Sequence, residues 1–560
     1  MADANAAIPW ITSPMETWNE ESDSFSPRHE ASTLELFFDL FFVANLATFT
    51  QYHAITNRYH FWSYIAFFIL IWTTWFHVVC FDVRFVSDSV FERASKLVHF
   101  CTFAGFALVG YKFNPVAKNV QTATPHWIYR LLCWALFASR LWLGLQYLVT
   151  AIFCSTHKNR HLRLKLPLML NAAVFLAAAV VYGSLSIGFS NVSTNLTGTI
   201  IGLYAVVLVE LVGTLGISCV WQRLSFSSTH VGERLGLLGL IIIGEGVIGT
   251  TKTITRIMGR NGVYFEGCAL IFCLVLILLF IWILYFDNLP RYKFGIVKQQ
   301  FWMALHLPFH ASILGVVEGS QQIALARNIF YNAEKLIVDT VYGCYFAHLD
   351  GEPLAQNLTK AVNYFKINET SSGKIALKSV FDSIYIIGNE TGICSPENLT
   401  LLDNQPDPLP LNFYPFLEST ISSLFQAFGL DLPPLEGNIT GLDIAARSWR
   451  LVYTYYYTSI VVLLVCLTTS ALLADKGLSW ERFKWISFMV RAAMVGASIV
   501  LLVMGLTNSD FFDNFIASAW VLPSVVLMLW ICCLGDRMSK WGRRRKGKMY
   551  EKVALREVHD

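Results

Sequence analysis

Ionisable side chains interrupt several long apolar segments of this 560-residue chain. A charged side chain at the centre of a lipid bilayer costs about 2.5–3.5 kcal/mol on insertion scales, so each one needs a partner, water or a function. The functions open to such groups are proton binding, cation binding and ion pairing between helices. The residues concerned are Glu35, Asp39, His77, Asp82, His99, Arg140, Glu210, Glu233, Arg234, Glu245, His306, His310 and Glu318.

Glu35 and Asp39 are four residues apart in the segment LELFFDLFFV and therefore share one face of a helix. Two carboxylates this close cannot both be ionised comfortably in a medium of low dielectric constant. A cation between them would relieve the repulsion, and so would Arg140 from another helix. Pairing of Arg140 with Asp39 or with Glu35 is our hypothesis.

Glu245 lies between two glycines in the glycine-rich segment HVGERLGLLGLIIIGEGVIGT. Glycines allow a neighbouring backbone to approach closely, and carbonyl groups freed from a weakened helix could form a cation or proton site beside the carboxylate. In the alternative interpretation the glycines serve packing, and Glu245 is a neutral, hydrogen-bonded acid. Both interpretations stay open.

His306 and His310 have the four-residue spacing that can present two nitrogens to one metal ion, with Pro308 between them. A proline kink could spoil or create that geometry. The chain lacks the HExxH arrangement of metalloproteases and a phosphate-binding Walker A loop. We favour hydrogen-bonding roles for both histidines, and we predict no metal site, no cofactor and no catalytic residue.

The composition requires a membrane. Hydrophobic residues make up 55% of the chain, charged residues only 14%, and the mean hydropathy is +0.49. Soluble domains carry about 25% charged residues, so this chain cannot cover a normal water-facing surface. We predict an all-α, polytopic bundle of about 12 transmembrane helices whose partners are the lipid bilayer and a small solute or ion. Nucleic acid is not expected as a partner, and an oligomer is allowed.

Twelve segments have the length and apolarity of a membrane span. They lie near 33–53, 61–83, 91–111, 127–153, 165–188, 197–221, 232–254, 265–287, 299–325, 447–474, 483–507 and 512–535. The links 157–165, 221–234, 288–298 and 475–484 and the C-terminal tail are basic, which places them and both termini in the cytoplasm. The membrane is expected to be the plasma membrane or an endomembrane.

The segment 326–446 is acidic and is predicted to lie outside the cytoplasm, as a small cap over the bundle. Residues 413–428 within it show the three- and four-residue spacing of an amphipathic helix. Acceptor motifs for glycosylation occur at Asn191, Asn195, Asn357, Asn368, Asn389, Asn398 and Asn438. Cys344 and Cys394 are the two cysteines of this segment and could form one disulfide bond, with free thiols as an equally weighted alternative.

These features divide the chain into five expected parts. They are a cytoplasmic N-terminal tail (1–32), a membrane domain of about nine spans (33–325), the glycosylatable insertion (326–446), three further spans (447–535) and a basic cytoplasmic tail (536–560).

Several motifs resemble those of the low temperature requirement A family. The segment TLELFFDLFFV (33–43) is similar to its opening signature PLELFFDLVFV, and Trp72, Trp75 and the charged stretch 82–93 are similar to its second motif. Arg140 occupies the place of its fourth-span arginine. The segment from His230 to Ile248 resembles ERxGLxxIIxLGES, with Gly246 in place of the usual serine. LYFD (284–287) and LHLP (305–308) resemble two further motifs.

The resemblance covers residues 33–325 and implies a polytopic helical fold. It also implies that seven charged or titratable residues matter: Glu35, Asp39, Glu233, Arg234, Glu245, Asp287 and His306. Together with Arg140 they form our predicted set of ion- or proton-binding residues. The resemblance implies little chemistry, because the family is named from a growth phenotype.

The combination of acids on several spans, a glycine-rich helix and a proline-kinked helix is typical of secondary transporters. We therefore expect a proton- or cation-coupled transporter with Asp39 and Glu245 as exchange sites. The alternative is a membrane scaffold or low-temperature sensor in which the buried charges only hold helices together. An intramembrane enzyme that uses His306, His310 and an acid comes last, and we do not expect enzyme activity.

Overall fold

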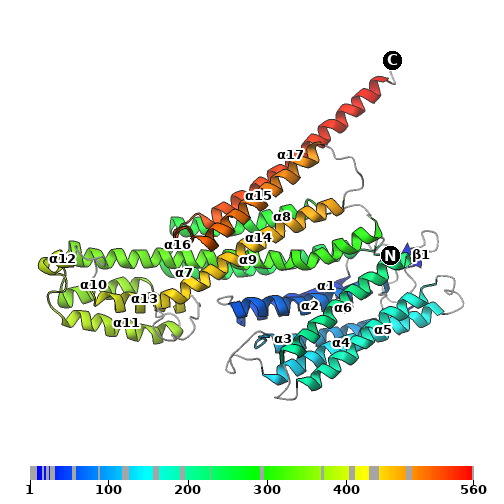
Figure 1. Ribbon diagram of the computed structural model, residues 1–560, viewed down its shortest axis with the longest axis horizontal. Helices are drawn as coiled ribbons and strands as arrows, with labels where there is room; N and C mark the ends of the chain where they lie inside the picture. The colour runs from blue at the N-terminus through cyan, green and yellow to red at the C-terminus, as the bar shows by residue number, and fades with distance from the viewer. Residues whose placement is uncertain are drawn as a thin grey trace. The chain divides into compact units, whose positions relative to one another are not determined.

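The computed structural model describes most of the chain. The described residues are 9–14, 18–19, 24–25, 32–52, 58–85, 89–115, 125–155, 163–189, 196–226, 229–289, 295–367, 371–402, 410–427, 441–474 and 482–557. Within them the predicted all-α, polytopic helix bundle is confirmed (Figure 1). The only strands in this part of the chain are the two-residue segments β1 (Trp18–Asn19) and β2 (Ser24–Phe25), which pair antiparallel.

Long helices follow one another along the chain. The first eight are α1 (Thr33–Tyr52), α2 (Arg58–Phe85), α3 (Val90–Gly110), α4 (His126–Ser155), α5 (Lys165–Gly188), α6 (Leu196–Val220), α7 (Val231–Asn261) and α8 (Phe265–Phe286). The others are α9 (Ile296–Val341), α10 (Gly351–Tyr364), α11 (Ser371–Asn389), α12 (Pro396–Leu402), α13 (Phe413–Ala427), α14 (Gly441–Leu473), α15 (Arg482–Thr507), α16 (Ser509–Ala517) and α17 (Val521–Glu557).

Ten helices in the described part of the chain are long and apolar enough to cross a membrane. They include α1, α2, α4, α5, α6, α8, α9, α14, α15 and α17. The segments 91–111 and 232–254, also expected as spans, are helical as α3 and α7 but carry several charged side chains each. The protein is therefore a multi-pass membrane protein.

The chain divides into two compact units. Unit 1 contains residues 1–245, 282–314 and 462–485, and unit 2 contains residues 246–281, 315–461 and 486–560. The divisions fall inside α7, α8, α9, α14 and α15, so each of these helices contributes one part to each unit.

Helix α2 is the central helix of unit 1. Its last 19 residues, from 67 on, are almost all buried, whereas α5 and α6 bury only one face. Large rings pack around it: Phe81 and Phe85 contact Tyr147 of α4, and Tyr147 in turn stacks on Phe175 of α5. An apolar helix can face lipid, but charged side chains within a membrane span cannot. Because α2 carries Asp82 and Arg84, it must be enclosed by protein. It is therefore the element that positions buried polar groups in unit 1.

The cap belongs to unit 2, and its helices α10, α11 and α13 pack side by side (Figure 1). Helix α13 spans 413–427, so the helix predicted over 413–428 is confirmed. Its apolar stripe is buried at Phe413, Phe416 and Leu424.

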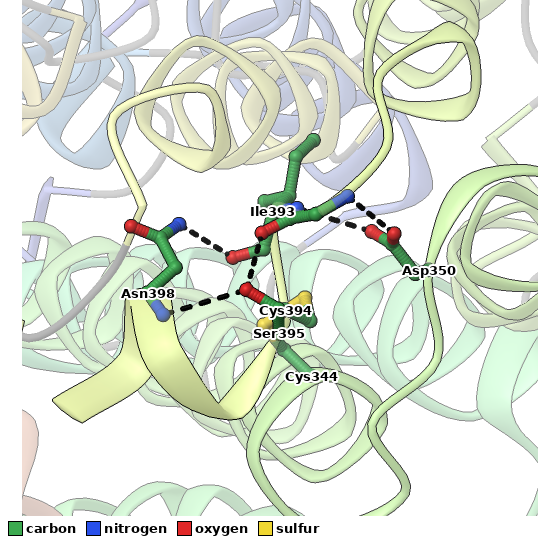
Figure 2. The surroundings of a disulfide bond; sticks show 7 residues. Cys344, Asp350, Ile393, Cys394, Ser395 and Asn398 are labelled. Carbon is green, nitrogen blue, oxygen red and sulfur yellow. Dashed lines mark hydrogen bonds between the residues drawn. A yellow bond between two sulfur atoms is a disulfide. The ribbon is translucent and has the colours of Figure 1, made fainter.

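A disulfide bond joins Cys344 to Cys394, with a distance of 5.1 Å between their Cα atoms. Figure 2 shows how the loop around Cys394 is held: the Asp350 carboxylate accepts hydrogen bonds from the backbone N–H groups of Gly392 and Ile393. The Asn398 side chain donates to the carbonyl oxygen of Ile393 at 2.9 Å. The cap thus has its own apolar core and its own cross-link.

Candidate functional site

Asp39 of α1 lies at the centre of a buried polar cluster in unit 1. Its Oδ1 atom accepts a hydrogen bond from Nη2 of Arg234 (α7) at 2.8 Å and another from the indole Nε1 of Trp75 (α2) at 2.7 Å. Its Oδ2 atom is buried and has no hydrogen-bond partner among the described residues. Both side chains of the ion pair are fully buried. The cluster therefore joins three helices through one carboxylate.

Glu35 shares the guanidinium of Arg234 with Asp39. Its Oε2 atom lies 3.8 Å from Nη1 of Arg234, and its Oε1 atom lies 3.6 Å from Nε2 of His230. The same carboxylate accepts the backbone N–H of Ser32 at 2.8 Å, while the Ser32 hydroxyl accepts the backbone N–H of Glu35. This reciprocal arrangement is a capping box, so Glu35 also stabilises the N-terminus of α1.

The cation that lies between the two carboxylates is therefore Arg234. The hypothesis that Arg140 pairs with Asp39 or Glu35 is wrong, because Arg140 is engaged elsewhere. Its Nε and Nη2 atoms each donate to Glu210 of α6 at 2.9 Å, and its Nη1 atom donates to Thr74 of α2 at 3.0 Å. A bidentate guanidinium–carboxylate pair is geometrically demanding, so it fixes α4 against α6.

His77 adds a titratable group to the Arg140–Glu210 pair. Its Nε2 atom lies 3.7 Å from Oε2 of Glu210, and its ring meets Phe175 edge-to-face. Neither ring nitrogen has a hydrogen-bond partner within the described residues. Glu210 and His77 were noted among the charged residues of apolar segments but were left out of the predicted binding set, because no motif marks Glu210 as the partner of Arg140.

A third buried pair consists of Asp82 (α2) and Lys96 (α3), whose ammonium group also lies over the ring of Phe38. The neighbouring side chains of His99, Gln146 and Glu92 form a short hydrogen-bonded chain at 3.3 and 3.4 Å. Sequence reasoning missed Lys96. Lys96 lies three residues after Arg93, the last charge of the second motif, and nothing in the sequence indicates that its side chain is buried.

His306 and His310 of α9 lie next to each other, with their ring centroids 5.4 Å apart. His306 is held by the Tyr285 hydroxyl at 3.1 Å and by the carbonyl oxygen of Trp302 at 2.8 Å. His310 accepts a hydrogen bond at Nδ1 from the indole of Trp72 at 3.1 Å. Within the described residues, no group of three or more His, Cys, Asp or Glu side chains could hold a metal ion. Through these contacts the two histidines connect α2, α8 and α9.

The other predicted binding residues lie apart from this cluster. Glu233 is exposed in the first turn of α7, although its neighbour Arg234 is buried. Asp287 is exposed just beyond the C-terminus of α8. Glu245 is half-buried further along α7. Unit 1 thus brings together Glu35, Asp39 and Arg234, and it places Arg140 beside Glu210 and His306 beside His310 in separate groups.

Three of the predicted glycosylation acceptors are described. Asn389, the last residue of α11, is exposed, whereas Asn357 and Asn398 are half-buried. Asn191, Asn195, Asn368 and Asn438 lie outside the described residues.

One protein-family model matches the part of the chain that contains these clusters. The model described as bacterial low temperature requirement A protein (LtrA) matches residues 30–348, more than half of the chain. The chain belongs to the low temperature requirement A family. The LtrA match includes all of the polar clusters just described and ends shortly after Cys344, before α10. No curated protein and no solved structure matched the chain in our comparisons.

Within the LtrA family, Gly246 of this chain stands where the family motif has serine. A Cβ atom at this position would lie 2.7 Å from Cγ1 of Val317 and 3.0 Å from Cδ2 of Leu278, both in unit 2. A serine at this position would require the side chains of Val317 and Leu278 to shift.

Proposed function

We propose that this LtrA protein is a proton-coupled secondary transporter of a small solute, with Asp39 as the residue that binds the coupled proton. The observation that carries the proposal is the unequal use of the two carboxylate oxygens of Asp39. Oδ1 accepts from both Arg234 and Trp75, while Oδ2 is buried and accepts from none of the described residues.

A proton that binds to Oδ2 neutralises Asp39 without removing an acceptor from either donor. The attraction between α1 and α7 then weakens, because a cationic guanidinium faces a neutral acid instead of a carboxylate. Arg234 keeps Glu35 as a second anionic neighbour at 3.8 Å, so its charge stays partly compensated. Binding or release of one proton at Oδ2 therefore changes the free energy of one helix arrangement relative to another. Coupling of proton binding to solute transport requires such a change.

The proton is favoured over a metal ion as the coupled species. A proton needs one acceptor oxygen, whereas Na⁺-like and divalent ions need several oxygens around one point. The other carboxylate of the cluster, Glu35, already faces two basic side chains, His230 at 3.6 Å and Arg234 at 3.8 Å, which disfavours a metal ion beside it.

Proton binding can be measured without knowing the solute. We expect an infrared difference spectrum between two pH values to contain a carboxylic acid C=O band that Asp39→Asn removes. Asp536→Asn is the matched control, because Asp536 is also a buried carboxylate paired with an arginine, Arg491, but lies in unit 2. This control should keep the band.

Transport is tested in proteoliposomes that contain an internal pH dye. Addition of organic cations, organic anions, sugars and amino acids in turn should move protons for at least one class. Asp39→Asn should abolish that movement, whereas Trp75→Phe, which keeps both charges, should retain part of it. If Asp39→Asn fails to fold, the double variant Asp39→Asn/Arg234→Gln, which removes both charges, takes its place.

The alternative is a non-transporting scaffold or sensor, favoured by the Arg140–Glu210 pair. Every oxygen of Glu210 and three nitrogens of Arg140 are used in contacts that fix helices. A scaffold predicts no titrating carboxyl band from Asp39 and no proton movement with any solute. That pair of results would overturn the transporter proposal.

A further inference from the structure

A second set of buried charged side chains interacts with Asp39 and has no part in the function proposed so far. It consists of the Asp82–Lys96 ion pair, which joins α2 to α3, and of Glu92 in the first turn of α3. All three residues belong to unit 1, as Asp39 does. Because Asp39 is fully buried, a proton that binds to it has to arrive through other groups.

Lys96 connects this set to Asp39. Its ammonium group lies over the ring of Phe38, 5.3 Å from the ring centroid, and Phe38 directly precedes Asp39 in α1. The charge of Lys96 also acts on the Asp39 carboxylate. A lysine side chain has a flexible four-carbon stem and three N–H donors that can rotate. Its ammonium group can therefore turn from one carboxylate to another.

Glu92 is the member of this set that lies closest to the end of its helix. Its backbone N–H donates to the hydroxyl of Ser89, which caps α3. Its carboxylate accepts a hydrogen bond from Gln146 of α4 at 3.4 Å. The charges of Asp82 and Lys96 both act on this carboxylate. Glu92 is thus coupled electrostatically to the ion pair.

The exposed fraction of the four side chains rises along this series of interactions. It is 0% for Asp39, 1% for Lys96, 3% for Asp82 and 6% for Glu92. Water therefore reaches Glu92 most easily and Asp39 least easily, so Glu92 is the acid at which a proton would enter.

Other charged or polar side chains face this set from the helices packed against it. They are Glu35 of α1, Arg140 and Gln146 of α4, His99 of α3 and Arg234 of α7. The two arginines keep their protons, because a guanidinium is not deprotonated in proteins. Among these cations, Lys96 is therefore the one that can pass a proton on.

We propose that Glu92 takes up the proton and that the Asp82–Lys96 pair passes it to Asp39, an inference that rests on the transporter function proposed above. The Glu92 carboxylate binds a proton from water and passes it to Asp82. Lys96 gives one ammonium proton to Oδ2 of Asp39 and takes up the proton held by Asp82. The net result is one proton on Asp39, with the other three residues returned to their initial charges.

The rate of proton arrival tests this route. The full chain in detergent is subjected to a rapid fall in pH, and time-resolved infrared spectroscopy follows the rise of the C=O band that Asp39→Asn removes. Glu92→Gln should slow this rise by about a hundredfold, since a positioned acid–base group contributes at least about that factor to a proton transfer. The final amplitude of the band should stay the same.

Three further variants separate proton transfer from a structural role. Glu92→Asp keeps a carboxyl group and should retain most of the rate, and added formate, a small weak acid, should restore the rate of Glu92→Gln. The double variant Asp82→Asn/Lys96→Met removes both charges of the pair and should slow the rise as Glu92→Gln does. Glu352→Gln is the matched control, because Glu352 is an exposed acid in the first turn of α10, in unit 2. It should keep the wild-type rate.

The outcomes distinguish this inference from the function on which it rests. Absence of a titrating Asp39 band in the wild-type protein would overturn the transporter proposal and the inference together. A wild-type rate in Glu92→Gln or in the double variant would overturn the inference alone. Slowing that neither Glu92→Asp nor formate relieves would assign Glu92 a structural role and overturn the inference as well.

Discussion

Nη2 of Arg234 and Oδ1 of Asp39 lie 2.8 Å apart, although the two residues are separated by 195 positions in the chain. Both side chains are fully buried, and the contact joins α7 to α1 within unit 1. A buried ion pair costs desolvation of both charges and is therefore weak evidence for stability alone. In the function proposed above, this pair changes its charge when Asp39 binds a proton.

Removal of one partner of this pair should destabilise the protein more than removal of both. Asp39→Asn leaves Arg234 with only the more distant carboxylate of Glu35, and Arg234→Gln leaves both carboxylates without their shared guanidinium, at a cost of up to about 3–5 kcal/mol each. The double variant should cost at least about 1 kcal/mol less than the sum of the two single changes. Thermal unfolding of the purified protein in detergent measures these values, with the exposed neighbour change Glu233→Gln expected within about 0.5 kcal/mol of wild type. Simple additivity would show that the pair does not interact.

Two glycines of α7 provide a matched test of close packing. Gly246→Ala should destabilise the protein by about 1–3 kcal/mol, because the new Cβ atom would lie 2.7 Å from Val317. Gly244→Ala should be neutral or stabilising by up to about 1 kcal/mol, since no atom lies within 4 Å of that position. The melting temperatures of the two variants, measured in the same detergent, test this prediction. An equal fall in melting temperature in both variants would contradict the packing described here.

The Cys344–Cys394 bond should stabilise the cap. It closes a loop with a sequence separation of 50, for which the chain-entropy model gives about 4 kcal/mol. The variant Cys344→Ser/Cys394→Ser should therefore make residues 351–427 more sensitive to limited proteolysis. Mass spectrometry of non-reduced peptides tests the bond itself, and detection of both cysteines as free thiols would refute it.

Asn389 should be the acceptor that carries a glycan if the cap lies outside the cytoplasm. It is exposed at the end of α11, whereas the Nδ2 atom of Asn398, to which a sugar would attach, donates a hydrogen bond to Ile393. After expression in eukaryotic cells, a glycosidase should shift the wild-type band on a gel more than the band of Asn389→Gln. Asn398→Gln serves as the comparison and should shift as the wild type does. An unmodified protein would place the cap on the cytoplasmic side.

The spacing of residues, and the free-energy cost of charge within a membrane, predicted the features that depend on residues close together in the sequence. The four-residue spacing placed Glu35 and Asp39 on one face of α1, and both carboxylates do contact the same guanidinium. The apolar stripe of 413–428 predicted α13 to within one residue.

The same arguments could not predict contacts between residues on helices that are far apart in the sequence. Arg140 and Arg234 are equivalent candidates for Asp39 in the sequence, and only the packing of α4 against α6 assigns Arg140 to Glu210. Glu233 is part of the predicted binding set because of the family motif. Adjacent residues of a helix point in different directions, so Glu233 is exposed although Arg234 is buried. The indole N–H groups of Trp72 and Trp75 could not be recognised as donors to His310 and Asp39, because hydropathy carries no information on where an indole N–H is directed.

Helix α2 makes three of these polar contacts within four residues. Trp72 donates to His310, Thr74 accepts from Arg140, and Trp75 donates to Asp39. A slide or rotation of this one helix would lengthen all three bonds at once, because their α2 residues lie within one helical turn. The three bonds therefore tie α1, α4 and α9 to one helix, so a displacement of α2 would be felt at all three contacts together.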